Sequence, residues 1–500
     1  MTLTCQLVPA WPKLAWVAVL EHGTARVLLR HGSHVELGDG SCVEGVWAGA
    51  FEDGGFDRSD LFFGSGIRCR GNRVVFASTS TMLDRLWHCR RGRRIYVANS
   101  LPALLACAEI SLLDDYQHYA ADIATLTKGL HDYKRTIPGR PSNISLTYYR
   151  NLEYDGRNLS EVAKPDTTPT FACYADYHAF LVEVANRLGA NLRSPSRKHR
   201  IAPLATVSSG YDSGAAAAIA REAGCTQTVS ITNASSLLPR SDSGQDVAHG
   251  LGMACRVYRQ TPEAYRREET IWSAAGDPAG LNLTVFGYPE PLCLLLTGYR
   301  GDTAWDSYVM DDCAPLSAPT IAGLSLCEFR LFRGLFHCPV PCWGALHVQQ
   351  IQTVSLMPEM APWRLNGDYD RPIPRRILEE AGVPRKAFGL RKKATFAPRS
   401  FFWPFTTRCA QSFRDYLRER GYSVPPPQAI TVLRKAAHLA MLVYSNTPRK
   451  LRPKFADPRT LLAIRAQSLL FQWANHELKK GYEAPLAPIV TENQTTGARS

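Results

Sequence analysis

The residues best suited to chemistry lie between positions 205 and 220, where small polar side chains separate an apolar segment from an alanine-rich one. This turn reads Ser208, Ser209, Gly210, Tyr211, Asp212, Ser213 and Gly214. Backbone N–H groups at the start of a helix attract anions, and small side chains let phosphate groups approach the main chain. We interpret residues 208–213 as a phosphate-binding loop in which Asp212 holds a metal ion. An ordinary strand-to-helix turn is the alternative.

This loop differs from two common nucleotide-binding motifs, since no lysine follows its glycine and G-x-G-x-x-G is absent. It resembles the S-G-G-x-D-S-S pyrophosphate loop of the asparagine synthetase superfamily, with Ser209 replacing a glycine and Gly214 replacing a serine. A serine is unfavourable there if its backbone needs a positive φ. The resemblance implies ATP and Mg²⁺, with ATP contacts from Ser208, Ser209, Gly210, Asp212 and Ser213.

A second apolar run, residues 294–297, ends in Gly298, Tyr299, Arg300, Gly301 and Asp302. It resembles the family's S-G-E-G-x-D-E segment. The resemblance implies that Gly298 lines the ATP site and that Asp302 shares the Mg²⁺ ion with Asp212. Two carboxylates suit Mg²⁺, because this ion prefers oxygen ligands. A lone aspartate after a strand is more often a helix cap, which is the alternative for each position.

Tyr299 stands where the family has a glutamate, and this departure resembles the β-lactam and carbapenam synthetase branch. In that branch a tyrosine and a downstream glutamate deprotonate an amine, which implies a catalytic pair of Tyr299 and Glu328. Tyrosine needs a neighbouring charge to act as a base at neutral pH. Arg300 could supply that charge or bind an acidic substrate. Alternatively, Tyr299 packs in the core and Glu328 is a surface acid.

The basic segment 370–396 resembles the family segment in which a helix is followed by a lysine that binds pyrophosphate. The resemblance assigns this catalytic role to Lys393, with Lys392 as the neighbouring alternative. A lysine suits the role because its point charge follows negative charge as it develops on the leaving group. A solvated basic loop is the other interpretation.

Short strands punctuated by Gly, Asp and Asn predict an α+β domain over residues 1–155. We expect strands at 14–20, 24–29, 74–77, 95–97 and 144–149. We expect helices at 101–107 and 113–121. The domain resembles the family's Ntn-hydrolase-like glutaminase domain, whose activity requires an N-terminal cysteine. Position 2 is Thr2, and Cys5 would become terminal only after removal of four residues. We therefore predict a degenerate glutaminase domain with a structural role.

Residues 156–170 are polar and proline-marked, which predicts a linker, and residues 171–490 form the second domain. There we expect helices and strands in alternation at 174–192, 201–207, 215–223, 228–232, 246–251 and 255–258. This alternation is typical of a doubly wound parallel sheet, the α/β fold that the resemblance identifies as a PP-loop ATP-pyrophosphatase domain. Thr232 would contact ATP near its adenine. A helical part follows residue 345, and residues 491–500 form a flexible tail.

Five hundred residues predict at least two domains, because single cores rarely exceed about 300 residues. Neither an apolar run of about 18 residues nor a signal peptide is apparent, so we expect a cytoplasmic protein without membrane contact. The net charge of +13 gathers in basic runs without interleaved aromatic residues, which argues against nucleic acid. Cys338 and Cys342 have no second ligand pair nearby, so reduced thiols are expected.

These features predict an ATP-dependent carbon–nitrogen ligase. A carboxylate of a small molecule or peptide would be activated as an acyl-adenylate, with release of pyrophosphate, and an amine would then displace AMP. Ring closure, as in lasso-peptide cyclases of the superfamily, is one form of this reaction. The alternatives are asparagine synthesis or another amidation with ammonia or external glutamine, and a catalytically silent ATP-binding scaffold. A homodimer or a biosynthetic partner protein is compatible with each of these roles.

Overall fold

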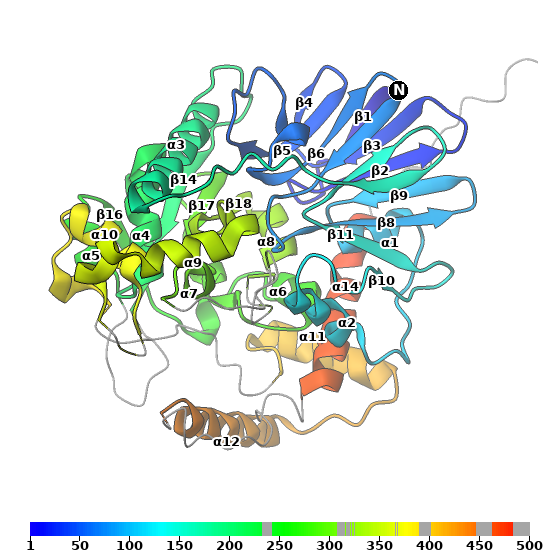
Figure 1. Cartoon of the computed structure of the whole chain (residues 1–500). Coiled ribbons are helices and arrows are strands. Elements are labelled where there is room, and N and C mark those ends of the chain that lie inside the picture. The colour runs from blue at the N-terminus through cyan, green and yellow to red at the C-terminus, as the bar shows by residue number, and fades with distance from the viewer. Residues whose placement is uncertain are drawn as a thin grey trace, which may run out of the picture.

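The part of the chain that the structure describes forms a mixed α/β structure with three sheets (Figure 1). The computed structural model describes residues 1–232, 243–307, 316, 321, 323–324, 326–365, 367, 369–389, 402–446 and 463–483. Two sheets lie in the N-terminal part of the chain and the third, which is parallel, lies in the second part. Lys393 and the tail 491–500 lie outside the described residues.

The first two sheets pack against each other and share an apolar core. One contains, in spatial order, β1 (Thr2–Leu7), β3 (Arg26–His31), β2 (Trp16–Glu21), β9 (Arg94–Ala98), β8 (Arg85–Arg91), β11 (Ile144–Tyr148) and β10 (Thr136–Ile137). The other contains β13 (Leu159–Val162), β12 (Asn151–Tyr154), β7 (Arg73–Ala77), β6 (Phe62–Arg70), β5 (Ser41–Trp47) and β4 (Glu36–Gly38). All pairs are antiparallel except β1 with β3.

Alternation along β2 explains how the first sheet buries both faces. Trp16, Ala18 and Leu20 enter the core between the two sheets, whereas Val17 and Val19 belong to the large core on the opposite side. Successive side chains of a strand point to opposite faces, so two apolar sets at alternate positions predict burial on both. Helix α1 (Leu101–Cys107) packs against that outer face, and Ser100 caps it by accepting a hydrogen bond from the Ala103 N–H.

The five predicted N-terminal strands correspond to β2, β3, β7, β9 and β11, and α1 has the predicted bounds, whereas the other eight strands of this part were not predicted. The helix expected at 113–121 was misplaced, because α2 spans Tyr119–Ala124. The backbone before it is bound elsewhere: the Leu113 N–H donates to Tyr119 Oη, and the Leu113 carbonyl accepts from Gln472. Part of the predicted linker is strand β13 at the edge of the second sheet.

The third sheet is wholly parallel, as the alternating pattern predicted. Its spatial order is β16 (Ala254–Tyr258), β15 (Gln227–Ile231), β14 (Ala202–Thr206), β17 (Cys293–Thr297) and β18 (Leu335–Pro339). Every residue of β17 is buried. Leu294 and Leu296 pack with helices α3 (Tyr174–Leu192) and α4 (Tyr211–Ala220), whereas Leu295 packs with α6 (Glu269–Ala275) and α8 (Leu326–Arg333). Cover on both faces explains the uninterrupted apolar run.

The later part of the chain is mainly helical, as predicted. Its longer helices are α9 (Val348–Leu356), α10 (Pro372–Glu380), α11 (Thr407–Glu419), α12 (Pro427–Asn446) and α14 (Ala463–Glu483). Helix α14 lies against α1 and α2 of the N-terminal part and against α6 of the second part (Figure 1). Among the described helices none is long and apolar enough to cross a membrane.

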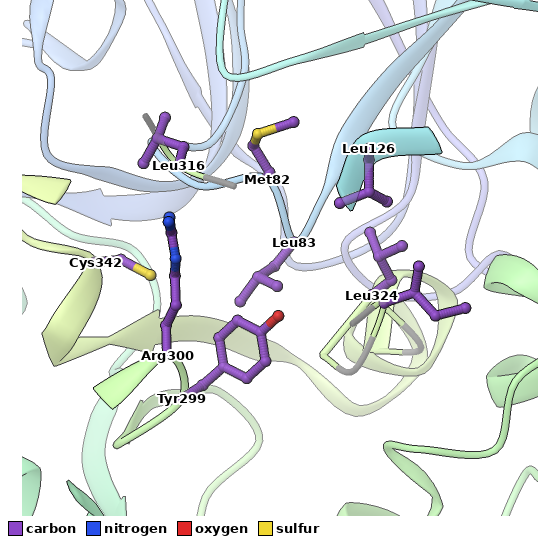
Figure 2. Close-up of a pocket in the computed structure, with 9 residues that line it drawn as sticks. Met82, Leu83, Leu126, Tyr299, Arg300, Leu316, Leu324 and Cys342 are labelled. Atoms are coloured by element: carbon purple, nitrogen blue, oxygen red, sulfur yellow. The ribbon is translucent and has the colours of Figure 1, made fainter. Parts of the chain in front are cut away.

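The two parts enclose a narrow cavity (Figure 2). The N-terminal part contributes Met82, Leu83 and Leu126 to its wall, and the second part contributes Tyr299, Arg300, Leu316, Ile321, Leu324 and Cys342. The lining is therefore apolar apart from one phenol, one guanidinium and one thiol. Tyr299 and Arg300 reach this cavity from the turn that follows β17.

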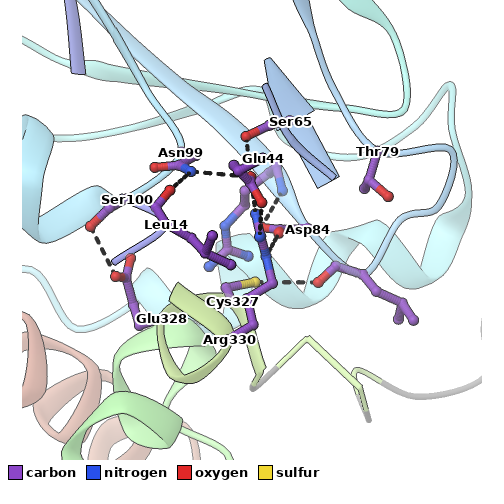
Figure 3. Close-up of polar contacts among 12 residues, drawn as sticks. Leu14, Glu44, Ser65, Thr79, Asp84, Asn99, Ser100, Cys327, Glu328 and Arg330 are labelled. Atoms are coloured by element: carbon purple, nitrogen blue, oxygen red, sulfur yellow. Dashed lines mark hydrogen bonds and ion pairs between the residues drawn. The ribbon is translucent and has the colours of Figure 1, made fainter. Parts of the chain in front are cut away.

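A buried ion network joins the parts beside this cavity (Figure 3). Arg330 on α8 reaches Glu44 on β5 through two hydrogen bonds, Nη1 to Oε2 at 2.7 Å and Nη2 to Oε1 at 2.9 Å. Its Nε donates to Asp84. Ser65 and Asn99 also donate to Glu44. A bidentate arginine whose Nε–H is also bonded to a carboxylate compensates for the desolvation of all three charges.

The network predicts a large loss of stability when the arginine is removed. In Arg330→Met, Glu44 and Asp84 remain buried without a cation, so we expect the free energy of unfolding to fall by about 3–5 kcal/mol. Chemical denaturation of the full chain measures this. The matched control is Arg73→Met, whose pair with Glu153 is exposed and should contribute at most about 1 kcal/mol. Equal losses in both variants would contradict the role of the network.

Candidate functional site

The parallel sheet has its topological switch point between β14 and β17. From β14 the chain proceeds outward through β15 to β16, and then it returns to the other side of β14 with β17 and β18. Helices that follow β14 and β17 therefore leave in opposite directions, which opens a crevice at the carboxyl ends of these two strands. Ligands of open parallel sheets bind in such crevices. The two turns singled out in the sequence follow these two strands.

The first turn leads from β14 into α4, a helix of ten residues that begins at Tyr211. Serine hydroxyl groups occupy two of its backbone donors: the Ser208 N–H donates to Ser213 Oγ at 3.0 Å, and the Gly210 N–H donates to Ser208 Oγ at 3.2 Å. The two hydroxyls are themselves 2.7 Å apart. The predicted loop residues Ser208, Ser209, Gly210, Asp212 and Ser213 thus gather at one helix start, where the dipole favours an anion.

The second turn is pressed directly onto the first. A Cβ atom added to Gly298 would lie 2.3 Å from the carbonyl carbon of Asp212, and one added to Gly301 would lie 2.5 Å from the Asp212 carboxyl carbon. Both distances are too short for any side chain. Asp212 can therefore contact the turn after β17 only because residues 298 and 301 are glycines. Asp302 is exposed in the first turn of α7 (Gly301–Ala304), next to this contact.

The loop departures have physical explanations in the structure. Ser209 is not among the described residues with positive φ, so the expected strain of a serine at this position does not arise. A Cβ atom at Gly214 would lie 3.2 Å from Val247 and 3.3 Å from Leu378. The glycine therefore lets α4 pack closely under α10 and α5 (Gln245–Gly250).

Three side chains that the sequence did not single out support the loop. The hydroxyl of Tyr369 accepts a hydrogen bond from the Tyr211 N–H at 3.4 Å, and Arg385 donates to the Tyr211 hydroxyl at 2.9 Å. Arg371 donates to the Asp302 carbonyl at 3.4 Å and pairs with Asp306 at 2.7 Å. These residues belong to the segment 369–389. The resemblance implied that the basic segment 370–396 reaches the pyrophosphate, but it did not indicate which side chains contact the loop.

The same segment reaches the loop through its backbone, because the Gly389 N–H donates to the Ser209 carbonyl at 2.9 Å. Lys393, the predicted pyrophosphate-binding residue, follows four positions later in the sequence and lies outside the described residues, as does Lys392. Thr232 directly follows β15, the strand beside β14, and its N–H donates to the Tyr258 carbonyl at 3.0 Å. It is thus on the same edge of the sheet as the loop.

Tyr299 lies in the cavity between the two parts (Figure 2). Its N–H donates to Thr297 Oγ1 at 3.4 Å, and Thr297 Oγ1 is 2.9 Å from His337 Nε2. Burial, with a smaller contribution from Arg330, lowers the pKa of His337 to about 4, so this imidazole is neutral at pH 7. Tyr299 therefore has a neutral hydrogen-bonding neighbourhood on the side of β18.

Glu328 has contacts with the N-terminal part instead of a surface position (Figure 3). Its Oε1 accepts from the Leu101 N–H at 3.1 Å and its Oε2 accepts from Ser100 Oγ at 2.9 Å, so it sits at the start of α1. The alternative that made it a surface acid was wrong, since Glu328 is 2% exposed. These contacts give the carboxylate a structural role, and its pairing with Tyr299 stays a prediction.

The donor set of the crevice fits a metal ion bound together with phosphates. No group of three or more His, Cys, Asp or Glu side chains that could hold a metal occurs in the part of the chain that the structure describes. Asp212 and Asp302 would supply two oxygen ligands, and phosphate oxygens would supply others. The described cysteines, including Cys338 and Cys342, are free.

No family model matches this chain, and no curated protein sequence matches it. Its activity must therefore be inferred from its own residues and their geometry.

The burial of Glu328 predicts a distinctive pH dependence of stability. Burial raises the pKa of Glu328 from 4.5 to about 7, while its two hydrogen-bond donors oppose the shift. The folded state then holds a proton that the unfolded chain lacks, so the stabilisation is full below about pH 4.5 and is lost as the pH rises to about 7. Relative to Glu328→Gln, the unfolding free energy of the wild-type protein should fall by up to about 3 kcal/mol across that window.

Urea denaturation at pH 5 and pH 7.5 measures this difference. Glu109→Gln is the control, because the Glu109 side chain is 83% exposed and its replacement should change little with pH. A wild-type protein and Glu328→Gln variant that differ equally at both pH values would show that Glu328 is ionised in the folded state throughout.

Proposed function

We propose that this protein is an ATP-dependent carbon–nitrogen ligase of the asparagine synthetase type, with a PP-loop synthetase domain and a degenerate, Ntn-hydrolase-like glutaminase domain. The observation that carries the proposal is the contact of the two turns at the switch point. Asp212 comes from the turn after β14, and Gly298, Gly301 and Asp302 come from the turn after β17. Their order, spacing and glycine-dependent contact support the resemblance better than either motif does alone.

ATP would bind with its phosphates at residues 208–213 and with its adenine toward Thr232. A phosphate oxygen is a stronger acceptor than a hydroxyl, so it would replace Ser208 and Ser213 as partner of the loop N–H groups. Asp212 and Asp302 would hold Mg²⁺, which offsets the negative charge of the phosphates when it is bound. Lys393 would face the departing pyrophosphate from the segment that Gly389 attaches to the loop.

The reaction has two steps. An oxygen of the substrate carboxylate attacks the α-phosphorus of ATP, the bond to the β-phosphate oxygen breaks, and pyrophosphate leaves. An amine then attacks the carbonyl carbon of the acyl-adenylate, AMP leaves with the bonding electron pair, and the amine loses one proton. We assign to Tyr299, in the second turn, the role of accepting this proton from the amine. Arg300 lines the same cavity as Tyr299 and would supply the neighbouring charge that a tyrosine needs to act as a base.

The tyrosine also bears on the choice of amine. The family members that use ammonia carry a glutamate at the position of Tyr299, and this chain has no acid there. We therefore favour an amine that belongs to the substrate itself or to a second organic molecule. Two alternatives are asparagine formation from ammonia or glutamine and a catalytically silent ATP-binding scaffold.

The test is the formation of AMP and pyrophosphate from ATP by the purified protein with Mg²⁺ and a small-molecule extract of its host. Asp212→Asn and Asp302→Asn should each reduce pyrophosphate release at least about 100-fold, because each removes a ligand of the Mg²⁺ ion that would offset the charge of the departing pyrophosphate. Asp39→Asn, in the exposed turn between β4 and β5, is the matched control and should leave the rate unchanged.

Unchanged pyrophosphate release in Asp212→Asn and Asp302→Asn would contradict the site. Release that begins only with added ammonia or glutamine would favour amidation. Failure of the wild-type protein to bind ATP with Mg²⁺ in calorimetry would refute the ligase proposal and leave the scaffold.

A further inference from the structure

A cleft with a volume of about 480 Å³ opens between the two N-terminal sheets. Its walls are β8, β9 and the start of β11 on the first sheet, and the turn that leads into β13 on the second sheet. Small-molecule sites in proteins have volumes of roughly 300–1,000 Å³, so the cleft is large enough for a ligand. All of its lining residues belong to the N-terminal part of the chain.

The inner face of the first sheet changes from apolar to polar at this cleft. Leu86 belongs to the core between the two sheets, whereas His88 and Arg90, the next residues of β8 on the same face, line the cleft. Ser145 on β11 lies directly opposite His88 and shares this face. Facing sheets normally pack through apolar side chains, so three polar side chains in succession indicate a use other than packing.

Contacts between the two sheets border the cleft on two sides. Thr147 on β11 donates to Glu161 on β13 at 3.0 Å, and Arg90 donates to the Arg157 carbonyl at 3.4 Å. Thr147 is paired with Leu86 in the sheet, so His88 lies between these two contacts along β8. The sheet edges are therefore joined on either side of His88, and the space between them is part of the folded structure.

The polar groups that line the cleft both donate and accept hydrogen bonds. Asn143 and Asn158 carry amides, and Ser145 carries a hydroxyl. Burial lowers the pKa of His88 to about 4, while Glu161 opposes the shift, so the neutral imidazole also has one donor and one acceptor at pH 7. Within the described ranges, the side chains at 88, 143, 145 and 158 have no hydrogen-bond partner, which leaves them available to a ligand.

The cleft combines these groups with little charge and some apolar surface. No acidic residue is among the described residues that line it, and Arg90 is exposed to water. Where the cleft meets the core between the sheets, Ile95 and Leu159 supply apolar surface. A sugar ring has the matching chemistry, because its hydroxyl groups donate and accept hydrogen bonds and its C–H groups form an apolar face.

We propose that this cleft binds a neutral saccharide of one or two rings. The side chains of His88, Ser145 and Asn158 would form hydrogen bonds with its hydroxyl groups, and Ile95 and Leu159 would contact the apolar face of a ring. The cleft shares no residue with the crevice between β14 and β17, so this inference does not depend on the proposed ligase function.

The test is ligand-observed saturation-transfer NMR of the full-length protein with glucose, galactose, mannose, N-acetylglucosamine, maltose and cellobiose. At least one of these sugars should bind, and cyclohexanemethanol, which has a ring but a single hydroxyl group, should not. His88→Phe and Asn158→Leu should each weaken binding of that sugar at least about tenfold, because each removes hydrogen bonds to it. The matched controls are His131→Phe and Asn72→Leu, since both residues are exposed in turns outside the cleft.

Asn158 lies in an exposed turn, so its replacement tests the site even if His88→Phe does not fold. Absence of binding by all six sugars would overturn the proposal, as would unchanged binding in a folded Asn158→Leu protein. Binding of inorganic phosphate or glucose 6-phosphate without any neutral sugar would replace the saccharide site with an anion site at Arg90. Sugar binding without pyrophosphate release from ATP would leave this site intact and count against the ligase alone.

Discussion

The pairing of Arg330 with Glu44 and Asp84 is the constraint on which the arrangement of the two parts depends. Three charges are removed from water at one point, and each is satisfied only when α8 docks on β5. A small displacement would leave a buried ion without its partner, so the interface has one favourable register. That register also fixes α8 and β18 and, through His337 and Thr297, the turn that carries Tyr299 and Arg300.

The site depends on glycine as much as on charge. Gly298 and Gly301 let two turns from neighbouring parallel strands come into contact, and Gly214 lets α4 pack under α10. Gly298 and Gly301 exclude a Cβ atom, and a Cβ atom at Gly214 would require Val247 and Leu378 to shift slightly. The parallel sheet places both turns at one edge, and the glycines bring Asp212 onto the second turn. The sheet topology therefore places the two turns at the same edge, and the missing side chains of the glycines allow the turns to touch.

The sequence predicted the parallel sheet and α3, because both follow from local periodicity. It did not predict β5 or β6. These strands carry Glu44 and the facing pair Gly45 and Gly64, which local rules count against a strand. Glu44 is buried there because it pairs with Arg330, which lies 286 positions away in the sequence. The support of the loop by Tyr369 and Arg385 was hidden for the same reason.

Helix α14 has a consequence for the order of folding during synthesis. Its residues contact segments made hundreds of positions earlier: Ser468 accepts from the Ala120 N–H, Gln472 donates to the Leu113 carbonyl, and Asn475 donates to the Ser273 carbonyl. The groove between α1, α2 and α6 therefore stays uncovered while the intervening chain leaves the ribosome. Its apolar residues, such as Tyr119, which contacts Phe471, and Trp272, which packs with Leu470 and Trp473, stay exposed until residues 463–483 have been synthesised.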